Sequence, residues 1–433
     1  MYRNKGTITV FLSLISMLFL SLFCTMAESV RVQAARFQAA AAFDMGLFSV
    51  FGEYDRVLLE EYDLWFLDGS SEEQKIREVL ETKLEKYIQP NINPRYNLAA
   101  GRSWDVFPTE LDRCTVDKYA LATDHGGQVF YSQAVENQKE LFVGEAASAL
   151  KKNIKQMEEG HQKGEEYQNE EQKADEEYQR AQAAQMEEKK RQESEKENAE
   201  KQEESDTDIK ETEAVQAKVE NPLDQIKKIK SMGILGLVLK DGTVVSDKTI
   251  ERKNLPSERN LQKGSLLVNE ISADPVSEAI FLNYLQKHFQ CAVDEGGKHQ
   301  KGSKEHSLSY ELEYIIGGQK SDRENLKKTV NRILLIREGM NYATLAKSAK
   351  MRGEAMALAA AITGAAALPE FAGALQKLLM LAWAYGESLL DVRTLLAKGK
   401  VPMLKAETEW KLPLEKLGML AEVLKECDAG GGN

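Results

Sequence analysis

The stretch TITVFLSLISMLFLSLFCTM, residues 7–26, contains no charged side chain. A helix of roughly 20 apolar residues crosses the hydrocarbon core of a bilayer, which is about 30 Å thick. Such a helix satisfies its own backbone hydrogen bonds and presents Phe, Leu and Ile side chains to lipid. We therefore predict a transmembrane helix at residues 7–26, with the lipid bilayer as a partner of the chain.

The charges beside this segment indicate its orientation. Arg3 and Lys5 precede it and Glu28 follows it, although Arg31 and Arg36 reduce the asymmetry. Basic residues favour the cytoplasmic side of a membrane. We expect a single-pass protein of the cell membrane, with residues 1–6 in the cytoplasm and the bulk of the chain outside it. A cleaved signal peptide is the alternative, but its apolar region is normally only about 7–15 residues long.

The composition excludes one class of partner and two kinds of site. The chain has 433 residues and a formal net charge of −12, and much of its acidity lies in residues 165–220. Binding of nucleic acid needs a basic face, so we expect no nucleic-acid partner. The four cysteines, Cys24, Cys114, Cys291 and Cys427, form no C-x-x-C pair. This excludes zinc ribbons and thioredoxin-type redox sites, whereas a disulfide remains open.

The pattern of the chain predicts a mostly helical α+β protein. Its expected segments are a cytoplasmic N-terminus at 1–6, the transmembrane helix at 7–26, a membrane-proximal helical and mixed region at 27–150, a charged spacer at 151–222, a C-terminal α+β domain at 223–428 and a flexible tail at 429–433.

The membrane-proximal region begins as an amphipathic continuation of the transmembrane helix. Its apolar residues recur mostly at spacings of three and four, which predicts one helical stripe. The stripe consists of Val30, Ala34, Phe37, Ala41, Met45, Phe48, Phe51, Leu58, Tyr62 and Trp65. We expect the helix to end at Asp68, and a capping box at Ser71 to open a second helix that runs through Ile88. Asp124-His125-Gly126-Gly127 predicts a turn rather than a metal site, because no second histidine lies nearby.

The charged segment at 151–222 lacks the apolar residues that a packed helix needs. Glu, Lys, Gln and Ala dominate it, Tyr167 and Tyr178 are its aromatic residues, and no apolar heptad persists. We predict a spacer that is either an isolated solvated helix or disordered.

The C-terminal domain shows alternating strand and helix signals. Residues 234–239 and 308–316 read as strands, the second because apolar and polar residues alternate. Asp274-Pro275 and the capping box at Ser321 open helices, and the apolar run from Ala355 predicts a helical hairpin rather than a second membrane span.

No constellation of residues assigns a catalytic, cofactor or metal site, and we expect the protein not to be an enzyme. His299, Glu305 and His306 are the best metal candidates, but their spacing matches no ligand pattern. The charged residues of the C-terminal domain read as caps and ion pairs, with a buried carboxylate cluster as the alternative. These residues are Glu311, Glu313, Asp322, Arg332, Arg337 and Glu387.

Two resemblances add to this interpretation. Lys5-Gly6-Thr7-Ile8 directly before the apolar helix resembles the leader of type IV pilin-like proteins, most closely the TadE/TadG-like pseudopilins of tight-adherence (Flp) pilus systems. The resemblance implies cleavage between Gly6 and Thr7. Many pilins have a glutamate five residues after the cleavage glycine, where this chain has Phe11.

The C-terminal domain resembles single-pass membrane proteins of Gram-positive anaerobes that contain a domain of unknown function. The resemblance is carried by YELEYIIGGQKSD at 310–322, by WAYGE at 383–387, by Asp391-Val392-Arg393 and by Lys400-Val401-Pro402. It implies no catalytic residues and no cofactor.

These observations lead to an expected function and an alternative. The first is a membrane-anchored extracytoplasmic structural or assembly protein, associated with a Tad/Flp-type pilus and its other components. The alternative is an exported module on a stalk that binds a ligand or the cell wall. The alternative predicts a pocket in residues 308–396, which the first function does not require.

Overall fold

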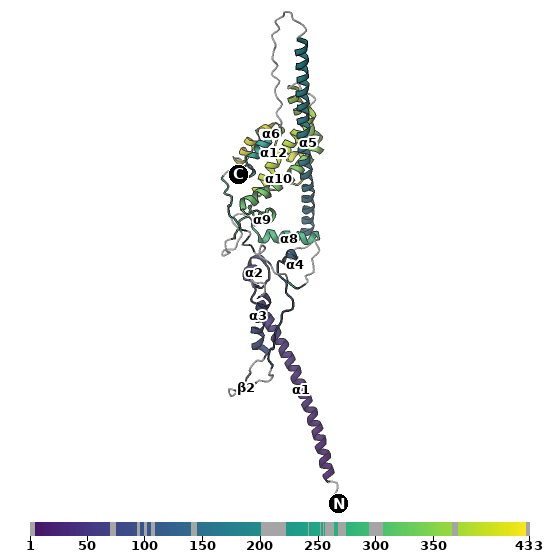
Figure 1. The fold of residues 1–433 in the computed structure, drawn as a ribbon, viewed down its shortest axis with the longest axis vertical. Coiled ribbons are helices and arrows are strands. Elements are labelled where there is room, and N and C mark those ends of the chain that lie inside the picture. Colours follow the sequence, from purple (N-terminus) through teal and green to yellow (C-terminus); the bar gives the residue numbers. More distant parts are fainter. Residues whose placement is uncertain are drawn as a thin grey trace. The chain divides into compact units, whose positions relative to one another are not determined.

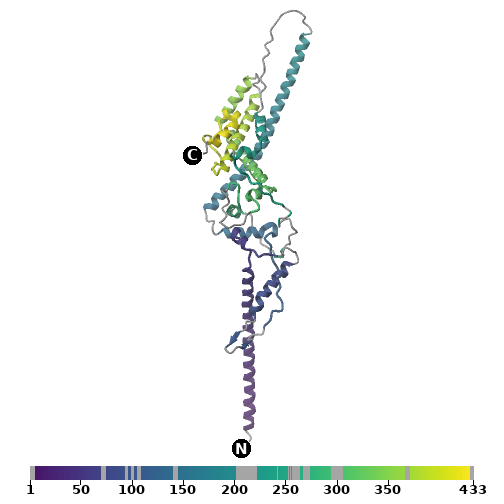
Figure 2. The same cartoon turned by 90° about the vertical axis from the view of Figure 1, so that its left-hand side faces the viewer.

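The computed structural model describes residues 5–69, 75–92, 96–98, 102–104, 109–139, 145–200, 222–240, 242–251, 253, 255, 264–266, 274–293, 306–365 and 371–429. The chain forms two compact units (Figures 1 and 2). Unit 1 comprises Met1–Leu141 and Lys253–Ser277, and unit 2 comprises Phe142–Arg252 and Glu278–Asn433. The described residues are mostly helical, as the sequence predicts.

The N-terminal helix α1, Lys5–Phe51, contains the predicted membrane span. It is long and apolar enough to cross a bilayer, and none of its most apolar window is buried. Leu18 and Phe23 are 67% and 65% exposed. Apolar side chains on every face are typical of a helix that crosses a membrane.

Beyond the span, α1 packs against α3, Lys75–Ile92, through small side chains. Ala42 and Val50 are buried there, and a Cβ at Gly46 would lie 2.5 Å from the Ile88 side chain. Large residues of the predicted stripe lie outside this contact, since Phe37 and Phe48 are 77% and 82% exposed. Small residues at the contact let two helix backbones approach closely, and this displaces the large side chains.

The helix also ends earlier than Asp68. After Phe51 comes a break at Gly52, and a separate helix α2, Arg56–Tyr62, is capped by the Asp55 side chain. Asp63, with a φ of 52°, ends α2 in the left-handed conformation. The capping box at Ser71 lies outside the described residues.

The rest of unit 1 contains a small antiparallel pair and one further helix. Strand β1, Tyr96–Leu98, pairs with β2, Arg102–Trp104. Helix α4, Asp124–Lys139, begins with His125, Gly126 and Gly127 at positive φ, so the predicted turn at these residues is confirmed.

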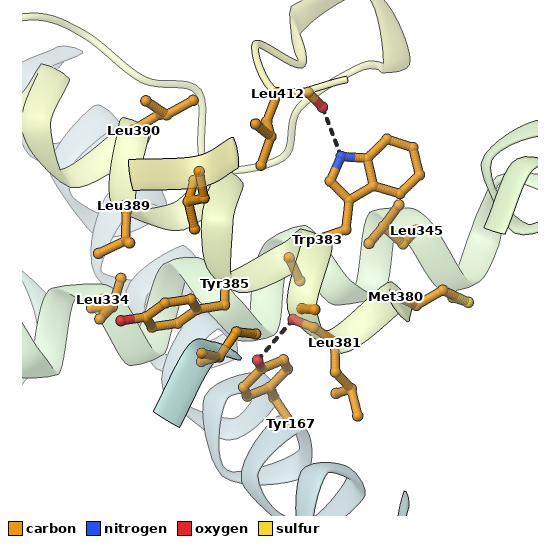
Figure 3. Close-up of a cluster of buried hydrophobic side chains, with 14 of the residues drawn as sticks. Tyr167, Leu334, Leu345, Met380, Leu381, Trp383, Tyr385, Leu389, Leu390 and Leu412 are labelled. Atoms are coloured by element: carbon orange, nitrogen blue, oxygen red, sulfur yellow. Dashed lines mark hydrogen bonds between the residues drawn. The ribbon is translucent and has the colours of Figure 1, made fainter. Parts of the chain in front are cut away.

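Unit 2 is built around α12, Ala372–Leu396, which is buried along most of its length. Helices α5, α6, α7, α10 and α11 pack against α12. The remaining bounds are α5 Glu145–Glu200, α6 Pro222–Ser231, α7 Ile234–Val238, α8 Pro275–His288, α9 Glu311–Gly317, α10 Asp322–Lys347, α11 Ala349–Ala365, the 3-10 helices η4 Glu407–Glu409 and η5 Leu414–Met419, and α13 Leu420–Ala429. Figure 3 shows Trp383, Tyr385 and Leu389 of α12 at the centre of this core.

Several predictions for unit 2 are confirmed. The Ser321 side chain accepts a hydrogen bond from the Glu324 backbone N–H and caps α10. The apolar run from Ala355 belongs to a pair of packed helices, α11 and α12.

The two predicted strands are wrong, and the α+β class is not confirmed. Residues 234–238 form α7 and residues 311–316 belong to α9, and the described residues after Pro222 contain no strand. In α9 the Glu311 and Glu313 side chains accept backbone N–H groups of Gln290 and Ala292, and Gly318 at a φ of 63° ends the helix. An alternating pattern over a short apolar run does not distinguish a strand from a helix that is fixed by such tertiary bonds.

The charged segment is also more than a spacer. Its residues 151–200 belong to α5, whose Tyr167, Ala174 and Tyr178 are buried in the core of unit 2, and residues 201–221 lie outside the described residues. The Tyr167 hydroxyl donates to the Leu381 carbonyl at 3.0 Å (Figure 3). Three buried residues at spacings of seven and four suffice for one packed face, although they are too few to form a sustained apolar repeat.

Glycines bring α5 unusually close to α10. A Cβ at Gly339 would lie 2.3 Å from the Gly164 nitrogen and 2.4 Å from the Lys163 carbonyl oxygen, and one at Gly164 would lie 2.8 Å from the Leu335 carbonyl oxygen. These contacts are with backbone, which cannot move aside as a side-chain tip can. The crossing therefore requires glycine on both helices.

This crossing gives a prediction with an internal control. Gly339→Ala should lower the free energy of unfolding by about 1–3 kcal/mol through overpacking, despite the better helix propensity of alanine. Gly353→Ala in α11, where a Cβ would meet nothing within 4 Å, should raise it by about 0.5–1 kcal/mol. Denaturant unfolding of the detergent-solubilised protein measures both. Equal effects at the two positions would contradict the close crossing.

Candidate functional site

A buried network of charged side chains joins α10 and α12 of unit 2. Arg337 donates to Asp391 at 2.7 Å, and Lys405 lies 2.5 Å from the same carboxylate. Lys405 also pairs with Glu387, and the Asn341 side chain donates to Asp391 at 3.0 Å. These four charged side chains are at most 3% exposed.

The network also holds the segment after α12 against α10 and α12 through hydrogen bonds to its backbone. Arg337 donates to the carbonyl oxygens of Pro402 and Met403 at 2.8 and 3.0 Å. Glu387 accepts the backbone N–H groups of Lys411 and Leu412. Such bonds occupy the carboxylate oxygens with fixed donors, which suits a structural role.

Removing one cation tests this assignment. Lys405→Met should lower the free energy of unfolding by about 3–5 kcal/mol, because it removes the cation that both Glu387 and Asp391 contact in the interior. Lys416→Met, at an exposed position of η5, should change it by less than about 0.5 kcal/mol. Denaturant titrations followed by the fluorescence of Trp383 and Trp410 measure the difference. A loss as small as that of the control would show that the network contributes little.

A cavity of about 710 Å³ lies beside this network. Its lining includes the buried residues Val238, Leu326 and Leu390. The size falls in the range of about 300–1,000 Å³ that is typical of sites for small molecules. Since its walls come from α7, α10, α12 and the segments after α7 and α12, the packing of unit 2 creates it.

Four basic residues also line the cavity. Lys240, Arg393, Lys398 and Lys411 belong to the described lining, which contains no carboxylate. The Lys411 Nζ donates to the Thr394 hydroxyl at 2.8 Å, and a guanidinium nitrogen of Arg393 donates to the Leu424 carbonyl oxygen. The cavity thus combines apolar residues with positive charge.

A second unusual group, Glu338 of α10, lies where α5, α6 and α12 meet. Burial raises the pKa of Glu338 to about 8, Lys230 of α6 lowers it and Glu171 of α5 raises it further. Lys230 pairs with Glu171 at 3.3 Å and lies 4.9 Å from the centre of the Tyr385 ring. Burial and the same two carboxylates raise the pKa of Tyr385. Glu338 is therefore protonated in the folded protein at neutral pH.

This pKa predicts how stability depends on pH. Between the value of 4.5 in the unfolded chain and about 8 in the folded one, unfolding releases a proton from Glu338. The free energy of unfolding should therefore fall as pH rises through this window, by up to about 1.4 kcal/mol per pH unit, and level off above it. Glu338→Gln, which mimics the protonated acid, should remove this slope, whereas exposed Glu415→Gln should keep it. Urea titrations at pH 5–9 measure the slope, and an unchanged slope in Glu338→Gln would contradict the burial of a protonated acid.

The structure separates most residues of the predicted carboxylate cluster. Asp322 accepts the backbone N–H groups of Ser309 and Tyr310 and the Ser246 hydroxyl, so it orders a loop. Glu313 accepts a backbone N–H as described above, and Arg332 donates to the Ile316 carbonyl. The charged network contains Arg337 and Glu387 from the cluster.

The histidine candidates form no ligand set among the described residues. His306 is hydrogen-bonded through Nδ1 to Glu311 at 2.6 Å, and His299 and Glu305 lie outside the described residues. No group of three potential metal ligands occurs in the part of the chain that the structure describes. Gly6 and Thr7 lie in the exposed first turn of α1, and nothing in their geometry tests cleavage between them.

Residues 212–433 match a family of unknown function, DUF5702. The chain belongs to this family. The matched region contains the charged network, the cavity and Glu338, whereas α5 lies before it. No curated protein and no solved structure matches the chain.

Sequence reasoning missed Lys405 and the cavity. Lys405 stands among other lysines at 398–416, and nothing in their pattern shows which one is buried. The cavity does include Tyr310, Leu326, Leu390 and Thr394, which lie in the region 308–396 where a binding module would have its pocket. Arg393 and Leu396 lie in the same region, and the rest of the lining comes from segments distant in the sequence.

Proposed function

We propose that this DUF5702 protein is a membrane-anchored, extracytoplasmic binding module, with the ligand site in the cavity of unit 2. The cavity is the observation that carries the proposal. It is the feature that favours a binding module over a purely structural protein, because a concave site of this size with apolar walls is typical of sites for small molecules.

The anchoring part of the proposal rests on α1. Its apolar segment is exposed on all faces, and the basic residues Arg3 and Lys5 precede it. Under the positive-inside tendency, unit 2 would lie on the outer side of the membrane.

We favour binding over catalysis because the buried carboxylates are already engaged in contacts within the protein. Glu387 and Asp391 are held by cations and N–H groups, and neither belongs to the described lining of the cavity. A general acid or base has to reach the bound molecule directly or through one water.

The binding proposal is tested by filling the mouth of the cavity. Ala397 is an exposed lining residue with a φ of −85°, which any residue adopts. In saturation-transfer NMR with a library of small soluble fragments, the solubilised full-length protein should bind a subset. Ala397→Trp should lose that subset and Ala360→Trp, at an exposed position of α11, should keep it. Binding that survives Ala397→Trp, or no binding at all, would contradict the proposal.

A structural or assembly role in a Tad/Flp-type pilus or related surface apparatus is the second candidate. It is supported by the large apolar side chains that α1 leaves exposed beyond the span, above all Phe37 and Phe48. Unpartnered apolar side chains are typical of surfaces that contact another protein or lipid.

A photo-crosslinking amino acid distinguishes contact with another protein from contact with lipid. Placed at Phe48 in the native host, it should yield protein adducts if the chain is an assembly component, and the same group at Val50, which is buried where α1 packs against α3, should yield fewer. Adducts with lipid alone at Phe48 would contradict the assembly role and leave the binding proposal standing.

A further inference from the structure

In unit 1, an excursion of the chain leaves the end of α3 and returns to it. Ile92 ends α3, and its carbonyl oxygen accepts a hydrogen bond from the Thr109 hydroxyl at 3.0 Å. Between these two residues lie the strands β1 and β2, which pair with each other in antiparallel register. The closing bond ties both ends of the excursion to α3, so the position of α3 decides where the strand pair begins.

Helix α3 runs along α1 toward the membrane-spanning segment. A Cβ at Gly46 of α1 would contact the Ile88 side chain, and farther along α3 the Asn91 carbonyl oxygen accepts a hydrogen bond from the Gln38 side chain at 2.9 Å. As the chain proceeds along α3, its contacts on α1 therefore move back toward residue 26, where the apolar segment ends. Both views place the strand pair farther in this direction than α3 (Figures 1 and 2).

The chain after α3 is long enough to reach a bilayer around the apolar segment. With the rise of a helix, Gln38 lies about 18 Å beyond Met26 along α1. An extended chain from Asn91 to Leu98 spans up to about 23 Å. The headgroup layer adds about 5–7 Å on each side of the hydrocarbon core, so β1 can enter it.

The register of the strand pair places its large residues on one face. Residues that stand opposite each other across an antiparallel pair share a face, and so do residues two apart along a strand. The three opposed pairs are Tyr96 with Trp104, Leu98 with Arg102, and Asn97 with Ser103. One face thus carries two aromatic residues, a leucine and an arginine, and the other carries two small polar residues.

This combination of residues is typical of the boundary between membrane and water. The amphipathic rings of Trp and Tyr are enriched at the level of the headgroups, and arginine pairs well with lipid phosphate. A strand pair with three residues in each strand is marginally stable in water by itself, so its apolar face needs a surface to lie on. A bilayer around residues 7–26 provides such a surface in the direction in which the pair extends.

We infer that the β1–β2 pair is a second membrane contact of unit 1, with the face of Tyr96 and Trp104 in the lipid headgroup layer beside α1. The inference rests on the anchoring by α1 that is part of the proposed function. A single spanning helix can tilt and rotate, and aromatic or basic residues at the headgroups limit both motions. The strand pair therefore fixes how unit 1 stands on the membrane.

Quenching of tryptophan fluorescence by lipid tests this contact. The full-length protein, which has four tryptophans, is reconstituted in nanodiscs with and without lipids that carry a nitroxide on the headgroup. Trp104→Phe should remove most of the quenching that the wild-type protein shows. Trp65→Phe is the matched control and should keep it. Trp65 packs on Tyr54 just after the end of α1, and this end lies about 37 Å beyond Met26.

Substitutions on the two faces of the strand pair connect the contact to the register. Tyr96→Ser combined with Leu98→Ser should lower the quenching of Trp104 about twofold or more, because binding to the membrane surface scales with the apolar area that is buried. Asn97→Ser, on the other face, should leave it unchanged. The quenching of Trp104 is obtained in each case by subtracting the signal of the same protein with Trp104→Phe.

The outcomes separate the second contact from the anchoring. Equal quenching of the wild-type and Trp104→Phe proteins would overturn the inference, and so would equal effects of Asn97→Ser and the double variant. A protein that elutes with the nanodiscs but shows no quenching of Trp104 has its anchor and lacks the second contact. A protein that does not enter nanodiscs would overturn the anchoring as well.

Discussion

The close approach of α5 to α10 is the constraint on which unit 2 depends. With Gly164 against Gly339, no side chain separates the two backbones, and Tyr167 can reach the Leu381 carbonyl of α12. Tyr178 and Ala174 then cover the same core. Helix α5 thus covers the core of unit 2 although its composition is dominated by charged and polar residues. Its packing depends on close backbone contact and three buried side chains rather than on overall hydrophobicity.

Strong local signals in the sequence predicted the elements that they encode directly. The apolar segment of α1, the cap at Ser321, the left-handed turn at His125 and the α11–α12 pair all follow from rules that act over a few residues. The strand assignments failed at α7 and α9, where the runs are short and tertiary hydrogen bonds decide the conformation. The burial of Tyr167 and Tyr178 depends on a crossing between Gly164 of α5 and Gly339 of the distant helix α10, and the apolar pattern within α5 does not reveal it.

The candidate site could likewise be predicted from the sequence only in part. Arg337 and Glu387 could be named as candidates because buried ion pairs use such residues, but their connection through Lys405 and Asp391 arises only from the fold. The cavity is still less visible in the sequence, since its lining is shared among segments that lie far apart along the chain. The network and the cavity are linked physically. The bonds from Glu387 to the backbone of Lys411 and Leu412 hold the segment that carries one of the cavity's cations.

The place of α5 has a practical consequence for work on the family. A recombinant fragment cut at residue 212, where the family match begins, would lack the helix that covers Tyr385 and Leu381. Such a fragment would expose apolar surface that α5 normally covers. It would therefore be prone to aggregate or to bind chaperones, whatever its native activity. Cloning boundaries for soluble expression belong upstream of α5, and alignments that begin at the family boundary omit part of the folded domain.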